Sequence, residues 1–282
     1  MSELIHHYTS LETLALILKH KTLRFNRLDR VDDVNEAQAV SGIQFGKCFF
    51  ASCWTNSSEE SIPLWHMYTN EMTGVRISLP VHMFKLRPLV PDLKLGFVSQ
   101  GTILSPVPFE KLITSSYFLQ PTFLDQKHFF DRVHYADSVE EEYKRAVEIH
   151  RDETRGTAGI KIHDPCRLAR LKKKVWEFQA ECRFVLFALP SMPLPPLGFA
   201  DPGFAVQLST ALLNALLKGE GPGIEYFDVE LEERELDKIL VTAGPLCSEG
   251  QYLIAESLVA EFTTQGRVVR SNLAGSIRRS QR

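Results

Sequence analysis

Residues 174–188 alternate between apolar and polar side chains over more than a dozen positions, and no other stretch constrains the fold as strongly. A repeat of two residues is typical of a β-strand, whose successive side chains point to opposite faces. We therefore expect one long strand here. Its apolar face would carry Trp176, Phe178, Ala180, Cys182, Phe184, Leu186 and Ala188. Its other face would begin polar and become apolar near the end: Glu177, Gln179, Glu181, Arg183, Val185 and Phe187.

The polar face of this expected strand allows more than one interpretation. Gln179 and Glu181 would share a face and lie about 7 Å apart along the strand. An amide and a carboxylate held side by side can bind the hydroxyls of a sugar. Alternatively, the polar face meets solvent, and Glu181 and Arg183 are surface charges. A pairing of Arg183 with Glu181 or with the Asp-rich loop at residues 26–36 is a further interpretation.

Composition narrows the class of protein. The 282 residues carry a formal net charge of -3, which gives no whole-chain attraction to nucleic acid or membranes. No apolar run approaches the roughly 20 residues that a membrane span needs, and the first residues do not have the pattern of a secretory signal. Five cysteines without a Cys-x-x-Cys pair indicate reduced thiols in a cytoplasmic protein, and a structural zinc site is not expected.

The order of predicted elements favours a single α+β domain over residues 1–275, followed by a basic, disordered tail at 276–282. We expect mixed, mostly antiparallel sheets with flanking helices. Thr9 and Glu12 have the spacing of a capping box at the start of the first helix. Helices are expected at 11–20, around 65–68, and at 138–154, 211–217 and 248–264. Other strands are expected at 4–8, 22–25, 48–54, 75–79, 133–135, 224–231 and 267–271, with a strand and turn over 239–245.

Two charged stretches remain open to interpretation. The loop from Asn26 to Glu36 is dense in Asp and Arg, and it forms either a solvated set of ion pairs or one wall of a polar site. The basic run at 165–174 is a helix or an approach segment to the long strand. Its charges form either a solvated face or a contact for phosphate or nucleic acid.

Taken in order, these landmarks resemble a family of bacterial proteins known only as a domain of unknown function. The resemblance covers nearly the whole chain. Where this chain has Gln179, the family usually has Glu. The segments that carry the resemblance are Tyr8 to Glu12, Leu23 to Phe25, Ala51 to Trp54, Trp65 to Gly74, Trp176 to Arg183, and Gly244.

The layout also resembles the ADP-ribosyltransferase fold, which implies NAD as the cosubstrate. By that resemblance Gln179 and Glu181 form the catalytic element. Glu181 would stabilise the positive charge that develops on the ribose as nicotinamide leaves, and Gln179 would orient the acceptor. His7 would bind the adenosine-side ribose, with Thr9 beside it. The remaining residues expected to bind NAD are Tyr8, Arg24, Ser52, Trp54 and Tyr68, of which Ser52, Trp54 or Tyr68 would line the nicotinamide pocket.

The resemblance implies transfer of ADP-ribose to a macromolecule, either protein or nucleic acid, as bacterial toxins or phage-defence effectors do. An antitoxin or operon partner would fit such a role. Two alternatives stay open. The chain is a non-catalytic nucleotide-binding or regulatory module of the same fold, or it is a nuclease that holds Mg²⁺ through Asp29, Asp32, Asp33 and Glu36.

Overall fold

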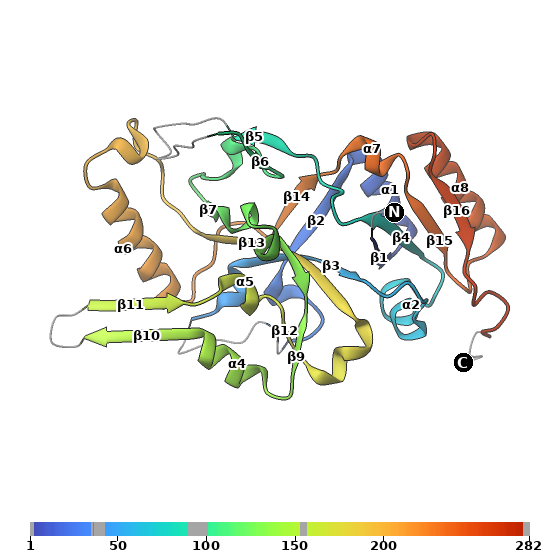
Figure 1. Ribbon diagram of the computed structural model, residues 1–282, viewed down its shortest axis with the longest axis horizontal. Coiled ribbons are helices and arrows are strands. Elements are labelled where there is room, and N and C mark those ends of the chain that lie inside the picture. The colour runs from blue at the N-terminus through green and yellow to red at the C-terminus, as the bar shows by residue number, and fades with distance from the viewer. Residues whose placement is uncertain (1–2, 35, 37–42, 90–100, 153–156, 279–282) are drawn as a thin grey trace.

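A computed structural model describes residues 3–34, 36, 43–89, 101–152 and 157–278. Its main sheet has the strand order β14-β2-β3-β1-β4-β15-β16 (Figure 1), and β13 pairs with β3, β7 and β8. The pairs are antiparallel except for β15 and β16. The bounds are β1 (Leu4–Thr9), β2 (Thr22–Arg27), β3 (Phe49–Thr55), β4 (Val75–Pro80), β7 (Tyr117–Gln120), β8 (Phe130–Arg132), β13 (Glu181–Pro190), β14 (Tyr226–Glu230), β15 (Leu240–Ala243) and β16 (Arg267–Arg270).

Helices cover the sheet, and short two-stranded pairs extend from it. The helices are α1 (Leu11–His20), α2 (Ile62–Tyr68), α3 (Gln126–Phe129), α4 (Val139–Ala146), α5 (Pro165–Leu168), α6 (Phe204–Leu217), α7 (Glu233–Leu236) and α8 (Glu249–Phe262). The small pairs join β5 (Arg87–Leu89) to β6 (Ile103–Ser105), β9 (His134–Ala136) to β12 (Leu171–Lys173), and β10 (Val147–Asp152) to β11 (Thr157–Ile162). The 3₁₀ helices among the described residues are η1 (Leu28–Arg30), η2 (Phe45–Lys47), η4 (Phe109–Lys111), η5 (Pro121–Leu124), η6 (Lys174–Gln179) and η7 (Gly198–Ala200).

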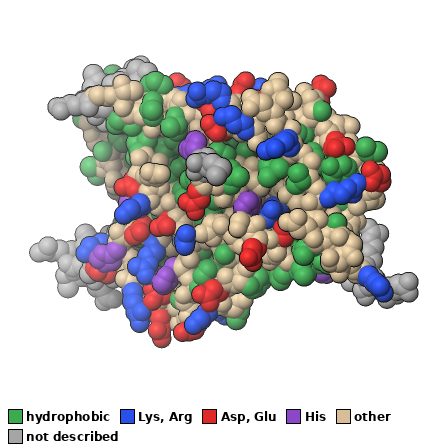
Figure 2. Space-filling model, turned by 45° about the vertical axis from the view of Figure 1, so that its right-hand side comes forward, with side chains coloured by type: hydrophobic (Ala, Val, Ile, Leu, Met, Phe, Trp, Pro, Cys, Tyr) green, Lys and Arg blue, Asp and Glu red, His purple; other side chains and the backbone are tan. Residues whose placement is uncertain are grey.

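The core is built on both faces of the sheet. On one face, Ile5 and Ile77 pack in the same apolar cluster as residues of α1 and α8. On the other face, Tyr8 packs with Trp65 of α2. The mixed α+β class with a mostly antiparallel sheet and flanking helices is therefore confirmed. Figure 2 shows acidic and basic side chains interspersed on one face of the molecule. In the described part of the chain, no helix combines the length and hydrophobicity that a membrane span requires.

The prediction of one long strand over residues 174–188 is wrong for the first half of that stretch. Residues 174–179 form the 3₁₀ helix η6, and Ala180 adopts a left-handed conformation with φ 42°, which a strand cannot continue. The strand β13 begins at Glu181. Phe178, expected on the buried apolar face, is 47% exposed. From Glu181 to Ala188 both faces of β13 are buried, which accounts for the apolar run at its end.

Other differences concern where helices begin and end. The helix expected at 138–154 stops at Ala146, and residues 147–152 form β10 instead. The helix α6 starts seven residues before the expected 211–217. The first helix is capped by Ser10, whose hydroxyl accepts the Thr13 N–H at 3.2 Å, whereas Thr9 ends β1, so the expected Thr9 capping box is wrong.

At the other end of the chain, the start of the expected tail packs against the fold. Ile277 contacts the apolar cluster around Trp65. Residues 279–282 lie outside the described part of the chain.

The strands at the centre of the sheet separate from one another. β1 and β3 pair only at His6 and Thr55. β2 and β3 pair only at Asn26 with Ala51 and at Arg27 with Phe50. Away from these junctions, β3 leaves both neighbours, and the space between them opens into the cavities described next.

Candidate functional site

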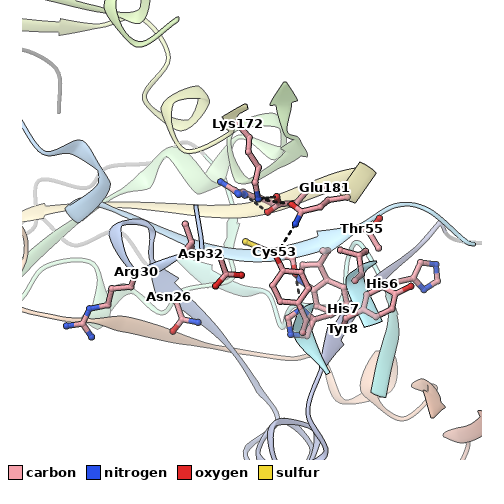
Figure 3. Close-up of a pocket in the computed structure, with 16 residues that line it drawn as sticks. His6, His7, Tyr8, Asn26, Arg30, Asp32, Cys53, Thr55, Lys172 and Glu181 are labelled. Atoms are coloured by element: carbon pink, nitrogen blue, oxygen red, sulfur yellow. Dashed lines mark hydrogen bonds and ion pairs between the residues drawn. The ribbon is translucent and has the colours of Figure 1, made fainter. Parts of the chain in front are cut away.

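Two adjoining cavities occupy the space between β1, β2 and β3. The Glu181 cavity has a volume of about 440 Å³ and reaches from the loop at Arg30 and Asp32 to the start of β13 (Figure 3). The Arg24 cavity, of about 800 Å³, lies between α1, β2 and β3. They adjoin because six residues line both: His7, Tyr8, Asn26, Val31, Cys53 and Tyr68.

All nine residues that the sequence proposed for the site line one or both cavities. Glu181, Gln179 and Trp54 line the Glu181 cavity. Thr9, Ser52 and Arg24 line the Arg24 cavity. His7, Tyr8 and Tyr68 line both. The structure thus brings together side chains from β1, β2, β3, α2 and β13, whereas their individual chemical roles remain predictions.

A buried quartet of charges lies at one end of the Glu181 cavity: Lys172, Glu181 and Arg183 line the cavity, and Glu36 contacts Lys172 and Arg183 from outside its lining. Glu181 accepts from Arg183 Nε at 2.6 Å through Oε1 and from Lys172 Nζ at 2.9 Å through Oε2. Glu36 lies 2.9 Å from Lys172 Nζ and 2.5 Å from Arg183 Nη1. Glu181 is 6% and Arg183 1% exposed, so the interpretation of both as surface charges is wrong. Arg183 pairs with Glu181 and also with the Asp-rich loop through Glu36.

The formal charges of the quartet sum to zero, and Glu181, Lys172 and Arg183 hold one another in their charged forms. Burial by itself would raise the pKa of Glu181, but Arg183 and Lys172 outweigh burial and lower that pKa to about 2. Burial would lower the pKa of Lys172, yet Glu181 and Glu36 raise it above its ordinary value. Two carboxylates and two cations therefore balance. An ionised, largely buried carboxylate is thus available in the cavity at neutral pH, held by two cations.

Gln179 and Glu181 do not share a strand face. Lys172 connects them, because its ammonium group bonds to both side chains. The Gln179 carbonyl Oε1 accepts from Lys172 Nζ at 2.7 Å, and the same ammonium donates to Glu181. The Gln179 amide Nε2 donates to the Tyr68 hydroxyl at 3.0 Å. The sequence did not point to Lys172 as a site residue, and it named Glu36 only as a ligand of the alternative Mg²⁺ site and as part of a possible polar wall. Two stretches of the sequence contain these residues, the basic run at 165–174 and the loop from Asn26 to Glu36. A solvated surface was one of two interpretations of each stretch.

His6 and His7 have different environments. His7 lines both cavities, and its Nδ1 donates to the Cys53 carbonyl at 2.8 Å. Burial lowers the pKa of His7, although the bond to Cys53 opposes this. His6 contributes to the Glu181 cavity only, and its Nδ1 lies 2.8 Å from Ser78 Oγ. In Figure 3 the two rings diverge, which leaves His7 as the histidine shared by both cavities.

The walls of the cavities are fixed by contacts of their own. Trp54 packs near the His7 ring at 5.2 Å between centroids and donates its indole N–H to Ser52 Oγ at 3.0 Å. The Tyr8 hydroxyl accepts the backbone N–H of Ser61 at 3.1 Å. Arg24 donates twice to Asp228, at 2.9 and 3.0 Å. A ligand would therefore meet a largely preformed site.

The Asp-rich loop is an ion-paired segment and also a wall of the site. Asp29 accepts twice from Arg27, whereas Asp32 lines the Glu181 cavity and Glu36 joins the quartet. Asp33 is buried, with 5% of its surface exposed. Within residues the structure describes, no group of three or more His, Cys, Asp or Glu side chains could hold a metal ion.

Comparisons with protein-family models, with curated proteins and with solved structures find no match to this chain. The function is therefore inferred from the chemistry of the two cavities.

Proposed function

We propose that the chain binds NAD across the two adjoining cavities, cleaves the bond between nicotinamide and ribose, and transfers ADP-ribose to a protein or nucleic acid. The observation that carries the proposal is the ionised Glu181 carboxylate in a cavity walled by the rings of His7, Trp54 and Tyr68. Flat rings suit a nicotinamide. A second cavity next to the first suits a dinucleotide, which has two bulky halves.

The proposed chemistry uses charge stabilisation. As nicotinamide leaves, positive charge builds on the ribose, much as in glycoside cleavage. A fixed carboxylate in a water-poor cavity stabilises that charge more than one in water. Each carboxylate oxygen has two acceptor positions, and among the described residues Arg183 and Lys172 supply one donor to each oxygen of Glu181. A ribose hydroxyl can therefore donate to Glu181 with the quartet intact.

The acceptor side of the proposal involves Gln179. Its position beside Glu181 on the Lys172 ammonium would let it orient an incoming nucleophile. A toxin or phage-defence effector fits this activity, and such a protein would need an antitoxin or operon partner. The transferase proposal therefore includes a further expectation, that strong expression of the wild-type chain alone slows growth.

The test is nicotinamide release from NAD labelled on its adenosine side, with and without cell lysate. Glu181→Gln should lower release by about 10²- to 10³-fold, the usual effect of removing one group that stabilises transition-state charge. Circular dichroism and NAD binding would show whether the variant stays folded. Glu140→Gln, which changes an exposed carboxylate paired with Lys144 outside both cavities, should leave release unchanged. A folded wild type that binds NAD without releasing nicotinamide would overturn the enzymatic proposal.

One observation favours a second candidate, a non-catalytic nucleotide-binding module. Both oxygens of Glu181 already hold a cation, and the quartet is neutral, as a purely structural cluster would be. That candidate expects NAD or a related nucleotide to bind wild type by calorimetry without turnover. Turnover that Glu181→Gln abolishes would exclude it.

A further inference from the structure

The hydrogen bonds around Gln179 have a direction that Lys172 sets. An ammonium has donors only, so the group that faces Lys172 at 2.7 Å must be the Gln179 carbonyl oxygen. The amide nitrogen of Gln179 then faces the Tyr68 hydroxyl at 3.0 Å. The orientation of this amide follows from the charge next to it.

The same reasoning fixes the role of Tyr68. An amide nitrogen only donates, so the Tyr68 oxygen accepts from Gln179 and its own proton must be donated elsewhere. No protein acceptor for that proton is recorded among the described residues. Tyr68 lines both cavities, so a ligand at their junction lies within reach of the hydroxyl. Burial raises the pKa of Tyr68, so the hydroxyl keeps its proton at neutral pH.

His7, at the same junction, has the opposite role. The Cys53 carbonyl can only accept, so the His7 nitrogen 2.8 Å away carries the proton. The other ring nitrogen, Nε2, is then an acceptor as long as the ring is neutral. Burial, which lowers the pKa of His7, keeps the ring neutral near pH 7.

We propose that Tyr68 and His7 act as a neutral donor and acceptor pair that selects the ligand through one uncharged group able to accept and donate hydrogen bonds. Lys172 and Gln179 are positioning residues in this scheme, since they fix the direction of the Tyr68 hydroxyl. The inference rests on the proposed function, because NAD carries two groups of this kind, a primary carboxamide and sugar hydroxyls. A carboxylate lacks the proton that His7 requires, so nicotinic acid should bind more weakly than nicotinamide.

Two probes distinguish the two sources of such a group. Nicotinamide has the carboxamide without ribose, and ADP-ribose has the hydroxyls without carboxamide. Calorimetry would measure the affinity of each probe for wild type and for Tyr68→Phe. For the probe whose group contacts Tyr68, the variant should bind about fivefold more weakly, which is the usual effect of losing one hydrogen bond. Tyr252→Phe, on α8 outside both cavities, is the matched control. Unchanged affinity of both probes for Tyr68→Phe would overturn the proposal.

A double-mutant cycle tests the link to Gln179. In Gln179→Glu the new carboxylate accepts from both Lys172 and Tyr68, which turns the Tyr68 proton away from the ligand. Its loss of affinity should be similar to that of Tyr68→Phe, and the double variant should lose no more than either single variant. Losses that multiply would mean that the two side chains act independently, against the proposal.

A readout without ligand separates this inference from the proposed function. In protein labelled with ¹³C at the tyrosine ζ carbon, Gln179→Glu should shift the NMR signal of Tyr68, because its oxygen changes from acceptor to donor toward residue 179. If the Tyr68 signal does not move, Gln179 does not set the direction of the Tyr68 hydroxyl, and the inference fails whether or not NAD binds. A moved signal with no binding of either probe to wild type would support the direction and count against NAD as the ligand.

Discussion

At the scale of single residues, neighbouring histidines differ because strand alternation sends their side chains to opposite faces. His6 is buried beside Ser78 and near Arg76. Burial, with a contribution from Arg76, lowers the pKa of His6 from 6.5 to about 4. The folded protein therefore holds this ring neutral, whereas the unfolded chain protonates it below about pH 6.5.

This shift predicts a pH dependence of stability. Between pH 6.5 and 4 the unfolded state binds more protons at His6 than the folded state, so the free energy of unfolding should fall as pH falls through that window. Urea unfolding at several pH values measures the slope, and His6→Gln should make it shallower. His66→Gln, at an exposed position, is the control. A slope that His6→Gln leaves unchanged would contradict the prediction.

At the scale of elements, the turn that follows α2 is closely packed against its neighbours. Asn70, Glu71 and Met72 all have positive φ. Gly74, which leads into β4, has no room for a side chain, because a Cβ there would lie 2.3 Å from the Thr9 carbonyl oxygen and 2.9 Å from Thr69 Cβ. The end of β1, which lines the Arg24 cavity, thus rests directly on this glycine.

Gly74→Ala should destabilise the protein by about 1–3 kcal/mol, the range for overpacking, since backbone must move to admit the methyl group. The midpoint of urea unfolding measures this. Gly250→Ala is the matched control, because no atom lies within 4 Å of its added Cβ and α8 continues through it. Equal midpoints for wild type and Gly74→Ala would contradict the prediction.

Elements with a clear local signal could be predicted from the sequence. The helix α1 followed from the spacing of Leu14, Ile17 and Leu18, which are buried as expected. The segment before β13 could not be read in this way, because a short 3₁₀ turn and a strand both fit six residues of mixed polarity. A glycine at position 180 would have indicated a left-handed conformation, but the alanine found there did not.

Residues that line the candidate site could be predicted from the sequence, but the ion pairs that join its buried charges could not. Residues such as His7, Tyr68 and Glu181 could be proposed from their order along the chain, and they do line the cavities. The inward position of Lys172 could not, because its partners Glu36 and Glu181 meet it only through the tertiary fold. Local pattern carries no information on such long-range pairs.

At the scale of the whole molecule, Arg183 joins segments that are far apart in the chain. It contacts Glu36 of the Asp-rich loop, Glu181 of its own strand, and the carbonyl oxygen of Ala169 just after α5. It is 1% exposed. Loss of its charge would leave two buried carboxylates with one cation between them.

Arg183→Met should therefore destabilise the protein by about 3–5 kcal/mol, as removal of one partner from a buried ion pair does. Thermal or urea unfolding measures the change. Arg145→Ala removes an arginine whose side chain is 70% exposed and whose ion pairs are on the surface, and it should have little effect. Equal losses for the two variants would show that the quartet contributes no more than a surface pair.

The single backbone pairing between β1 and β3 lies beside the Glu181 cavity. The backbones of these strands pair only at His6 and Thr55, and a side-chain bond from His7 Nδ1 to the Cys53 carbonyl joins them next to that pairing. One and two residues further on, His7 and Tyr8 of β1 and Cys53 of β3 line both cavities. The spacing of β1 and β3 along both cavities thus depends on this pairing and on the His7 bond, so a substitution at Thr55 should alter the fit of a ligand in both cavities.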